Sequence, residues 1–211
     1  MSRFAILLGG DVEPTLRLRA QVAGARVIAA DGGMRHAKSL FVTVETWVGD
    51  FDSSPAELHQ RHKDVPRQTH PTDKDKTDGD LAVDLALASG ADELVLAGAL
   101  GGATDHALAH LGLLLRLALQ GIAVFGSSGV EEAYPLVPGT LSPDAPHGSR
   151  LSIIPLTSLT GLTLTGVYWP LQAVDVPLGS TWTVSNAVTG PVRITLAGGS
   201  AIVIVTLPQD Q

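Results

Sequence analysis

Five aspartates stand in two dense clusters in the first half of the chain, and their spacing suits metal-assisted phosphate chemistry. The first cluster is Gly49-Asp50-Phe51-Asp52-Ser53 and the second is Asp73-Lys74-Asp75-Lys76-Thr77-Asp78. Packed carboxylates repel one another and cost folding energy unless a cation or nearby bases neutralise them. Carboxylate oxygens suit Mg²⁺, which is typically held by one or two carboxylates together with substrate phosphates. The two clusters therefore predict a Mg²⁺-assisted reaction of a phosphate compound.

Each cluster also has a structural interpretation. The first suits an Asx turn that caps a helix beginning near Pro55, and the second suits a solvated charge run in which lysines balance the acids. An EF-hand loop would need Gly where the chain has Asp78. The letters Asp73-x-Asp75-x-Thr77 resemble the nucleophile motif of haloacid-dehalogenase-like phosphatases. That motif ends a buried apolar strand, whereas a polar stretch precedes it here, so a Mg²⁺-dependent phosphohydrolase stays an alternative.

A third candidate is the glycine-rich turn Gly98-Ala99-Leu100-Gly101-Gly102-Ala103-Thr104-Asp105-His106. Glycines let backbone amides approach a phosphate, and the amino terminus of the following helix favours an anion. Neither the Walker spacing nor Gly-x-Gly-x-x-Gly is present, and Asp105 also suits a helix N-cap. His106 and His110 share one helical face, which permits a zinc pair, but the zincin motif would need Glu at position 107.

The elements that must position these residues alternate over about the first 125 residues. Predicted helices, clearest over 77–89 and 105–120, lie between apolar runs that we interpret as buried strands at 4–8, 26–30, 45–48, 93–97 and 122–125. This alternation predicts an α/β fold with a Rossmann-like parallel sheet and helices on both faces. Ligands in such folds bind beyond the carboxyl ends of the strands. Both aspartate clusters and the glycine-rich turn fall where this rule places a site.

The composition changes after about Gly126. Four prolines between positions 135 and 146 break any helical pattern, and Thr- and Val-rich runs follow, separated by Gly, Pro and Asn. The runs predict a carboxy-terminal antiparallel β-sandwich; they lie at 150–154, 162–165, 173–176, 182–184, 192–196 and 201–206. We place the boundary within 127–147 and predict an α/β catalytic domain at 1–130 and a β-sandwich domain at 140–211.

Composition narrows the classes of function. Of the 211 residues 45% are hydrophobic and 17% are charged, which favours a packed core over disorder. The net charge of −7 argues against non-specific binding to nucleic acid or to an anionic membrane. With no cysteine there is no disulfide, zinc–thiolate site or cysteine nucleophile, and the simplest compartment is a reducing cytoplasm. No run is long enough for a signal sequence or a membrane span, so we expect a soluble protein.

Taken together and in order, these segments resemble the thiamine pyrophosphokinase (thiamine diphosphokinase) family. The first half matches in Ala30-Asp31-Gly32-Gly33, in both aspartate clusters and in the glycine-rich turn. In the second half, Thr160-Gly161-Leu162, Tyr168-Trp169-Pro170-Leu171 and Ser185-Asn186 are similar to the family's binding domain. Each motif is short, but their shared order over nearly the whole chain is specific.

The resemblance implies that a diphosphoryl group passes from ATP to the hydroxyl of thiamine, giving thiamine diphosphate and AMP. It implies ATP as cosubstrate, Mg²⁺ as cofactor, and a homodimer that binds thiamine between its subunits. The implied catalytic and metal-binding residues are Asp50, Asp52, Asp73, Asp75 and Asp78. The implied nucleotide-binding residues are Asp31, Gly32, Gly33, Gly101, Gly102, Asp105 and His106. The implied thiamine-binding residues are Ser185, Asn186, Trp169 and Trp182, although both tryptophans suit the sandwich core equally well.

Two positions depart from the family's pattern. Arg often follows the paired glycines, where this chain has Ala103, and Asn is common in the next helix, where it has His110. Without that Arg a bidentate phosphate donor is missing, and another base, such as Lys74 or Lys76, would have to replace it. A kinase of a thiamine-like alcohol and a non-catalytic nucleotide or thiamine binder therefore stay alternatives.

Overall fold

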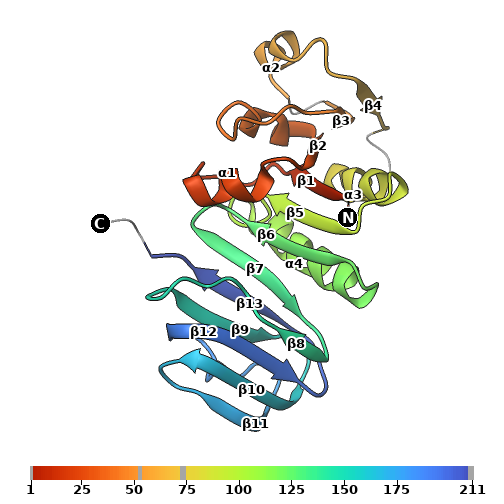
Figure 1. Cartoon of the computed structure of the whole chain (residues 1–211). Coiled ribbons are helices and arrows are strands. Elements are labelled where there is room, and N and C mark those ends of the chain that lie inside the picture. Colours follow the sequence, from red (N-terminus) through yellow and green to blue (C-terminus); the bar gives the residue numbers. More distant parts are fainter. Residues whose placement is uncertain (1, 52–53, 72–74, 209–211) are drawn as a thin grey trace. The chain divides into compact units, whose positions relative to one another are not determined.

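The computed structural model describes residues 2–51, 54–71 and 75–208, which form two compact units. The first unit comprises 1–110 and 122–129, and the second comprises 111–121 and 130–211. Figure 1 labels the elements of both units. Among the described helices, none combines the length and the apolarity that crossing a membrane requires.

The first unit is built on a parallel sheet. Its strands are β1 (Arg3–Leu7), β2 (Arg26–Ala30), β3 (Thr46–Gly49), β4 (Arg67–Thr69), β5 (Glu93–Ala97) and β6 (Ala123–Ser127). They pair in parallel in the order β6-β5-β1-β2-β3-β4. Between them lie α1 (Leu16–Val22), the 3-10 helix η1 (Asp31–His36), α2 (Ala56–Arg61), α3 (Asp78–Ala88) and α4 (Thr104–Leu119), the last of which continues into the second unit. The predicted alternation of parallel strands and helices is confirmed.

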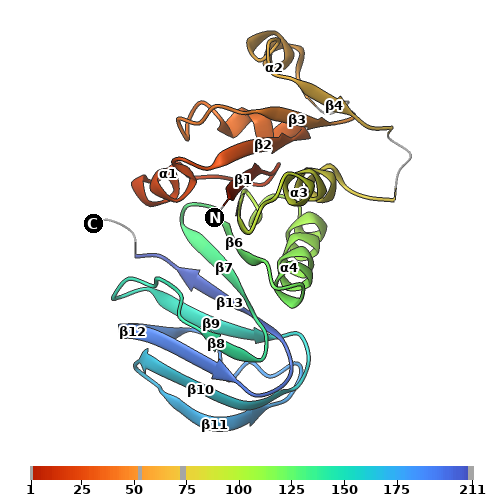
Figure 2. The same cartoon turned by 45° about the vertical axis from the view of Figure 1, so that its right-hand side comes forward.

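Helices cover both faces of this sheet. Successive strand residues point to opposite sides, so each strand packs against helices on both faces. Leu7 of β1 lies in one hydrophobic cluster with Leu18 of α1 and Trp47 of β3. Ile6 is equally buried and points to the other face. There α3 packs against β1, β2 and β3 (Figure 2) with Val83 fully buried. Thr77 caps α3, and its hydroxyl accepts a hydrogen bond from the Asp80 amide at 3.2 Å, as the capping pattern predicts.

The second unit contains antiparallel pairs throughout its described strands. These are β7 (Glu131–Leu136), β8 (Gly139–Leu141), β9 (Arg150–Pro155), β10 (Leu159–Val167), β11 (Leu171–Val176), β12 (Asn186–Leu196) and β13 (Ala201–Thr206). They follow the order β7-β13-β9-β12-β10-β11, and β8 also pairs with β12. The start of β12 pairs with β9, and the rest of it pairs with β10. The long strand β12 therefore connects two groups of strands, one made of β7, β13 and β9 and the other made of β8, β10 and β11.

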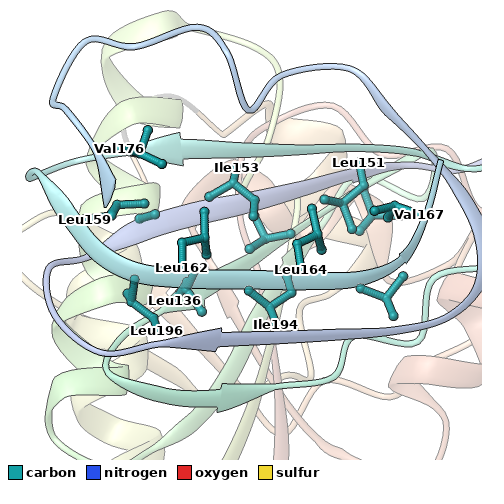
Figure 3. Packing of buried hydrophobic residues seen from close by; sticks show 14 of the residues in the cluster. Leu136, Leu151, Ile153, Leu159, Leu162, Leu164, Val167, Val176, Ile194 and Leu196 are labelled. Atoms are coloured by element: carbon teal, nitrogen blue, oxygen red, sulfur yellow. The ribbon is translucent and has the colours of Figure 1, made fainter. Parts of the chain in front are cut away.

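Leucine, isoleucine and valine side chains from both groups form a single core. Leu151 and Ile153 of β9 meet Leu162 and Leu164 of β10 in this cluster (Figure 3). The alternation of buried and exposed residues along β10 and β12 leaves one face of each strand for solvent. Gly166 allows a register shift in β10, because its φ is +79° and an added Cβ would lie 2.1 Å from the Pro191 carbonyl oxygen.

The structure departs from the sequence prediction in the shortest segments. The strand predicted at 182–184 is wrong: residues 182–185 form turns and bends, in which the Val184 amide donates to the Thr181 carbonyl at 3.3 Å. Three alternating residues are too few to distinguish a strand from a turn. The prediction also missed β4 in the first unit and β7 and β8 within the proline-rich stretch, whereas α2 begins directly after Pro55, where a capped helix was one interpretation of the first aspartate cluster.

We predict that Leu162→Ala lowers the free energy of unfolding by about 2–5 kcal/mol, because it opens a cavity in a fully buried core. The matched control is Leu16→Ala, since Leu16 is 82% exposed, and it should change stability by less than about 0.5 kcal/mol. Urea denaturation of both variants measures the difference. Equal effects of the two substitutions would contradict the assigned core.

Candidate functional site

The predicted site residues follow strands that end at one edge of the parallel sheet. Asp31 follows β2, Asp50 follows β3, and the second aspartate cluster comes after β4. Strands β3 and β4 pair with Gly49 opposite Thr69, and the amide of His70 donates to the Gly49 carbonyl at 3.0 Å. Both loops that carry aspartate clusters therefore begin at the same edge. Asp52 and Asp73 lie outside the described residues.

A cavity of about 400 Å³ lies at this edge, within the first unit. Five of the residues named from the sequence line it: Asp31, Gly32, Asp78, Gly101 and His106. The wall is completed by Leu8, Gly9, Gly10, Ala30, Arg35, Thr77, Gly79, Ala103 and His110. Loops after β1, β2 and β5 and the starts of α3 and α4 thus contribute to one cavity, as the strand-end rule predicts.

The other predicted residues of this site that the structure describes do not line the cavity. Asp50 is half-buried, and Asp75 and Asp105 are exposed. The Asp105 carboxylate accepts a hydrogen bond from the amide of the next residue at 2.8 Å. The amide of Gly102 donates to the Asp11 carboxylate at 3.2 Å. Gly33 lies beneath the wall, where a Cβ would come within 2.1 Å of the Leu7 carbonyl oxygen.

Asp31 is held in an unusual backbone conformation. Its φ of +38° is outside the regions that residues with a side chain favour. Its carbonyl accepts a hydrogen bond from the Trp47 indole at 2.8 Å, and its carboxylate accepts one from the Ser54 hydroxyl at 2.9 Å. These bonds tie the residue after β2 to β3 and to the loop of the first aspartate cluster. The carboxylate is therefore positioned by the fold rather than by its local sequence.

Sequence reasoning missed the loop after β1 and the side chains that hold it. Both Arg35 and His36 bond to the carbonyl of Gly10, through Nη2 at 3.1 Å and Nε2 at 2.9 Å, and Arg35 also bonds to that of Gly9. A Cβ on Gly10 would lie 2.3 Å from the Gly98 carbonyl oxygen. The signal was available: Gly9-Gly10 ends an apolar strand, as Gly98 does.

His110 is a neutral histidine with a defined tautomer. Its ring is buried, and Nδ1 lies 3.2 Å from the Ala99 carbonyl, which can only accept, so Nδ1 carries the proton. Burial lowers the pKa of His110, and His106 lowers it further, while the Ala99 hydrogen bond and Asp80 oppose them. The unprotonated Nε2 lies on the side of Gly79, at the start of α3.

Metal binding has only partial support in this geometry. Within 2–51, 54–71 and 75–208, no three His, Asp or Glu side chains gather closely enough to hold an ion. His106 and His110 are neighbours, with ring centroids 6.3 Å apart, but they have no third ligand among those residues. The carboxylates of Asp31 and Asp78 line the same cavity. Two carboxylates in one cavity are the type of oxygen ligand that Mg²⁺ prefers.

A second cavity, of about 530 Å³, lies in the second unit. Three of the predicted thiamine-binding residues line it: Trp169, Trp182 and Asn186. The tryptophans are 60% and 58% exposed, so their interpretation as core residues is wrong. The Asn186 side chain bonds to both the amide and the carbonyl of Trp169, at 3.1 and 2.8 Å. Ser185 does not line the cavity; its φ is +63° and its amide donates to Ser152 at 3.0 Å.

Comparison with known proteins finds two family models that match successive parts of this chain. A family model described as "Thiamin pyrophosphokinase, catalytic domain" matches residues 21–125, and one described as "Thiamin pyrophosphokinase, vitamin B1 binding domain" matches residues 140–200. The chain belongs to the thiamin pyrophosphokinase family. The recognition from sequence motifs is thereby confirmed.

Individual relatives are similar over both units. Thiamine pyrophosphokinase from Bacillus subtilis is 32% identical over 142 residues, which is 65% of this chain and 66% of that protein. The crystal structure of thiamine pyrophosphokinase from Bacillus subtilis has a TM-score of 0.87 at 25% identity, with 99% of this chain and 100% of that one covered. The structure of thiamin pyrophosphokinase from Geobacillus thermodenitrificans has a TM-score of 0.82 at 27% identity, covering 100% and 99%.

We predict that the protein loses stability as the pH falls, partly through His110. The unfolded chain protonates this histidine near its ordinary pKa of about 6.5, whereas the folded pKa is lower. The free energy of unfolding should therefore fall as the pH drops below about 6.5 toward the folded pKa. The His110→Asn variant keeps a donor for the Ala99 carbonyl but does not titrate.

Urea denaturation at pH 7.5 and pH 5.0 measures this effect. The loss of stability between the two values should be smaller in His110→Asn than in the unsubstituted protein, while His36, whose pKa burial also lowers, keeps contributing in both. Identical losses in the two proteins would refute the assigned neutral state.

Proposed function

We propose that the protein is a thiamine diphosphokinase that transfers the diphosphoryl group of ATP to the hydroxyl of thiamine, releasing AMP. The observation that carries the proposal is the cavity at the strand ends, with Asp31 and Asp78 on its wall, in a chain that matches both domain models of the family. The phosphohydrolase alternative is not favoured by these similarities.

The proposal assigns one substrate to each cavity. A Rossmann-like domain at 1–130 binds ATP in the cavity at the strand ends, with the predicted nucleotide-binding residues around it. A β-sandwich domain at 140–211 contributes the thiamine contacts. From the resemblance we also propose a homodimer that binds thiamine between its subunits, and a cytoplasmic location.

In the proposed reaction the thiamine oxygen forms a bond to the β-phosphorus of ATP. The bond from that phosphorus to the bridging oxygen of the α-phosphate breaks, and AMP leaves with the electron pair. The protein's work is to position the reactants and to stabilise charge on the phosphate oxygens. Gly101 lines the cavity, and we propose that its backbone amide contacts the phosphates, whereas the Gly102 amide would first have to release the Asp11 carboxylate. Asp75 or Asp78 takes the proton of the thiamine hydroxyl.

The carboxylates of the site fit a divalent ion. We propose that Asp50, Asp52, Asp73, Asp75 and Asp78 hold Mg²⁺ together with the phosphates of ATP. When bound, Mg²⁺ neutralises negative charge on the phosphate oxygens. Asp31, fixed by Ser54 and Trp47, faces the same cavity and adds a second described carboxylate beside Asp78.

The second cavity suits a flat, positively charged ligand. Thiamine carries a cationic thiazolium ring, and the faces of tryptophan rings attract cations. Asn186 fixes the backbone of Trp169 through two hydrogen bonds, so the main chain that carries this ring is held in place. We propose that Trp169 and Trp182 stack on the thiamine rings and that Ser185 and Asn186 contribute polar contacts.

The decisive assay measures AMP release from ATP in the presence of Mg²⁺, with and without thiamine. Release of AMP that depends on thiamine supports the kinase, and release of phosphate without thiamine supports the phosphohydrolase. If neither product forms, the result supports a non-catalytic protein that binds the nucleotide or thiamine. Replacing thiamine with other primary alcohols of similar structure tests the related kinase.

We predict that Asp78→Asn lowers turnover by about a hundredfold or more, because it removes a carboxylate from the cavity at the start of α3. Asp84→Asn, on the same helix, is the matched control: Asp84 pairs with Lys76 away from the cavity wall and should leave turnover within about twofold. Asp75→Asn measures separately how much the other described carboxylate of the second cluster contributes to turnover. Near-normal turnover in Asp78→Asn would remove this carboxylate from the reaction.

We predict that Trp169→Ala raises the KM for thiamine about tenfold, which corresponds to the loss of one aromatic contact with a cation. The KM for ATP should stay unchanged, because Trp169 lies in the second unit. Trp169→Phe keeps an aromatic face and should retain most of the affinity. Steady-state kinetics with each substrate varied in turn give both constants; unchanged KM for thiamine in Trp169→Ala would exclude the stacking role.

A further inference from the structure

We propose that Arg35 binds the phosphates of ATP, a role that no sequence motif assigns to it; this inference rests on the proposed function of the first cavity. Nucleoside triphosphates carry several negative charges, and a cavity lined by Asp31 and Asp78 repels them unless cations balance the field. Among the described residues on the wall, Arg35 is the one with a permanent positive charge. His110 is neutral, because burial lowers its pKa.

The guanidinium of Arg35 is fixed by one nitrogen and leaves the others available. Its Nη2 donates to the carbonyls of Gly9 and Gly10. Its Nη1 lies near Gly32, at 3.5 Å from the point where a Cβ on that residue would stand. All three glycines line the cavity. Within the described part of the chain, Nε and Nη1 make no hydrogen bond, so three N–H donors remain for an anion.

The positive charge of Arg35 is also not neutralised within the described ranges, where no carboxylate forms an ion pair with it. Other basic residues differ: Arg26 pairs with Glu45, and Lys76 pairs with Asp84. Lys76, suggested from the sequence as a replacement phosphate ligand, does not line the cavity. Lys74, the other suggestion, lies outside the described residues. An exposed guanidinium with free donors fits the bidentate geometry of a phosphate.

The backbone around Arg35 positions it before a ligand binds. The helix η1 lies against β1 because Gly33 allows contact with the Leu7 carbonyl. His36, the next residue, bonds to the same Gly10 carbonyl that Arg35 contacts. A side chain ordered in this way loses little conformational entropy on binding. The glycine loop and η1 therefore present a fixed cation on one side of the cavity.

The test separates the charge of Arg35 from its contacts with the loop. Arg35→Gln keeps an amide that can donate to a glycine carbonyl but removes the charge, and Arg35→Lys restores the charge without the fork. Calorimetric titration of the full chain with Mg-ATP and with adenosine gives the dissociation constants. We expect the constant for ATP to rise at least tenfold in Arg35→Gln and by less in Arg35→Lys, while that for adenosine stays within twofold.

Ala103 offers a second variant, because it lines the same cavity and a side chain there faces the same space. Arg35→Gln combined with Ala103→Arg should recover part of the lost affinity for ATP, by at least threefold. Unchanged affinity for ATP in Arg35→Gln overturns the inference, and so does an equal loss for ATP and adenosine, which would indicate that Arg35 only holds the loop.

The AMP assay on the unsubstituted protein keeps the two hypotheses apart. If this protein binds ATP but releases no AMP with thiamine, the proposed reaction fails while the role of Arg35 is still measured by binding. If it releases AMP and the Arg35 variants bind ATP normally, the reaction stands and the inference about Arg35 fails.

Discussion

Close backbone contact at the carboxyl edge of the parallel sheet is the constraint on which the first cavity depends. Gly33 touches the carbonyl of Leu7, and Gly10 touches that of Gly98, at distances where no Cβ fits. These contacts bring the loops after β1, β2 and β5 together. A side chain at either glycine would force the loops apart, and the side chains that now surround one cavity would separate. The lack of a side chain at Gly10 and Gly33 therefore sets the shape of the cavity.

Charge in this cavity follows from that arrangement. The loop after β2 supplies Asp31 and, one helical turn later, Arg35, so an acid and a base reach the same cavity from one short segment. Asp31 is tied to β3, whereas Arg35 is tied to the loop after β1. Because each is anchored to a different strand end, the two charges need not neutralise each other. Separated charges of both signs are what a site for a metal-bound polyphosphate requires.

The sequence predicted the long, strongly patterned elements and the edge of the sheet at which the first cavity lies. Strands such as β2 and β5 were placed at their observed bounds because their apolar runs end in Asp or Gly. The three-residue β4 and the turn around Thr183 carry too short a pattern to be recognised. Asp31 and Asp78 were found because they lie in motifs. Arg35 and the Gly9-Gly10 loop were missed because their role arises from contacts between segments that are distant in the sequence.

The same reasoning explains why Ala103 does not argue against a phosphate site. The binding of a phosphate depends on where a cation lies in the cavity and not on which segment of the chain supplies it. Residue 103 and Arg35 line the same cavity although 68 positions separate them. A base lost from the glycine-rich turn can therefore be replaced from η1 without any change in the path of the backbone. If Arg35 has the proposed role, the departure from the family's motif changes only the segment that supplies the positive charge, and the chemistry required of the cavity stays the same.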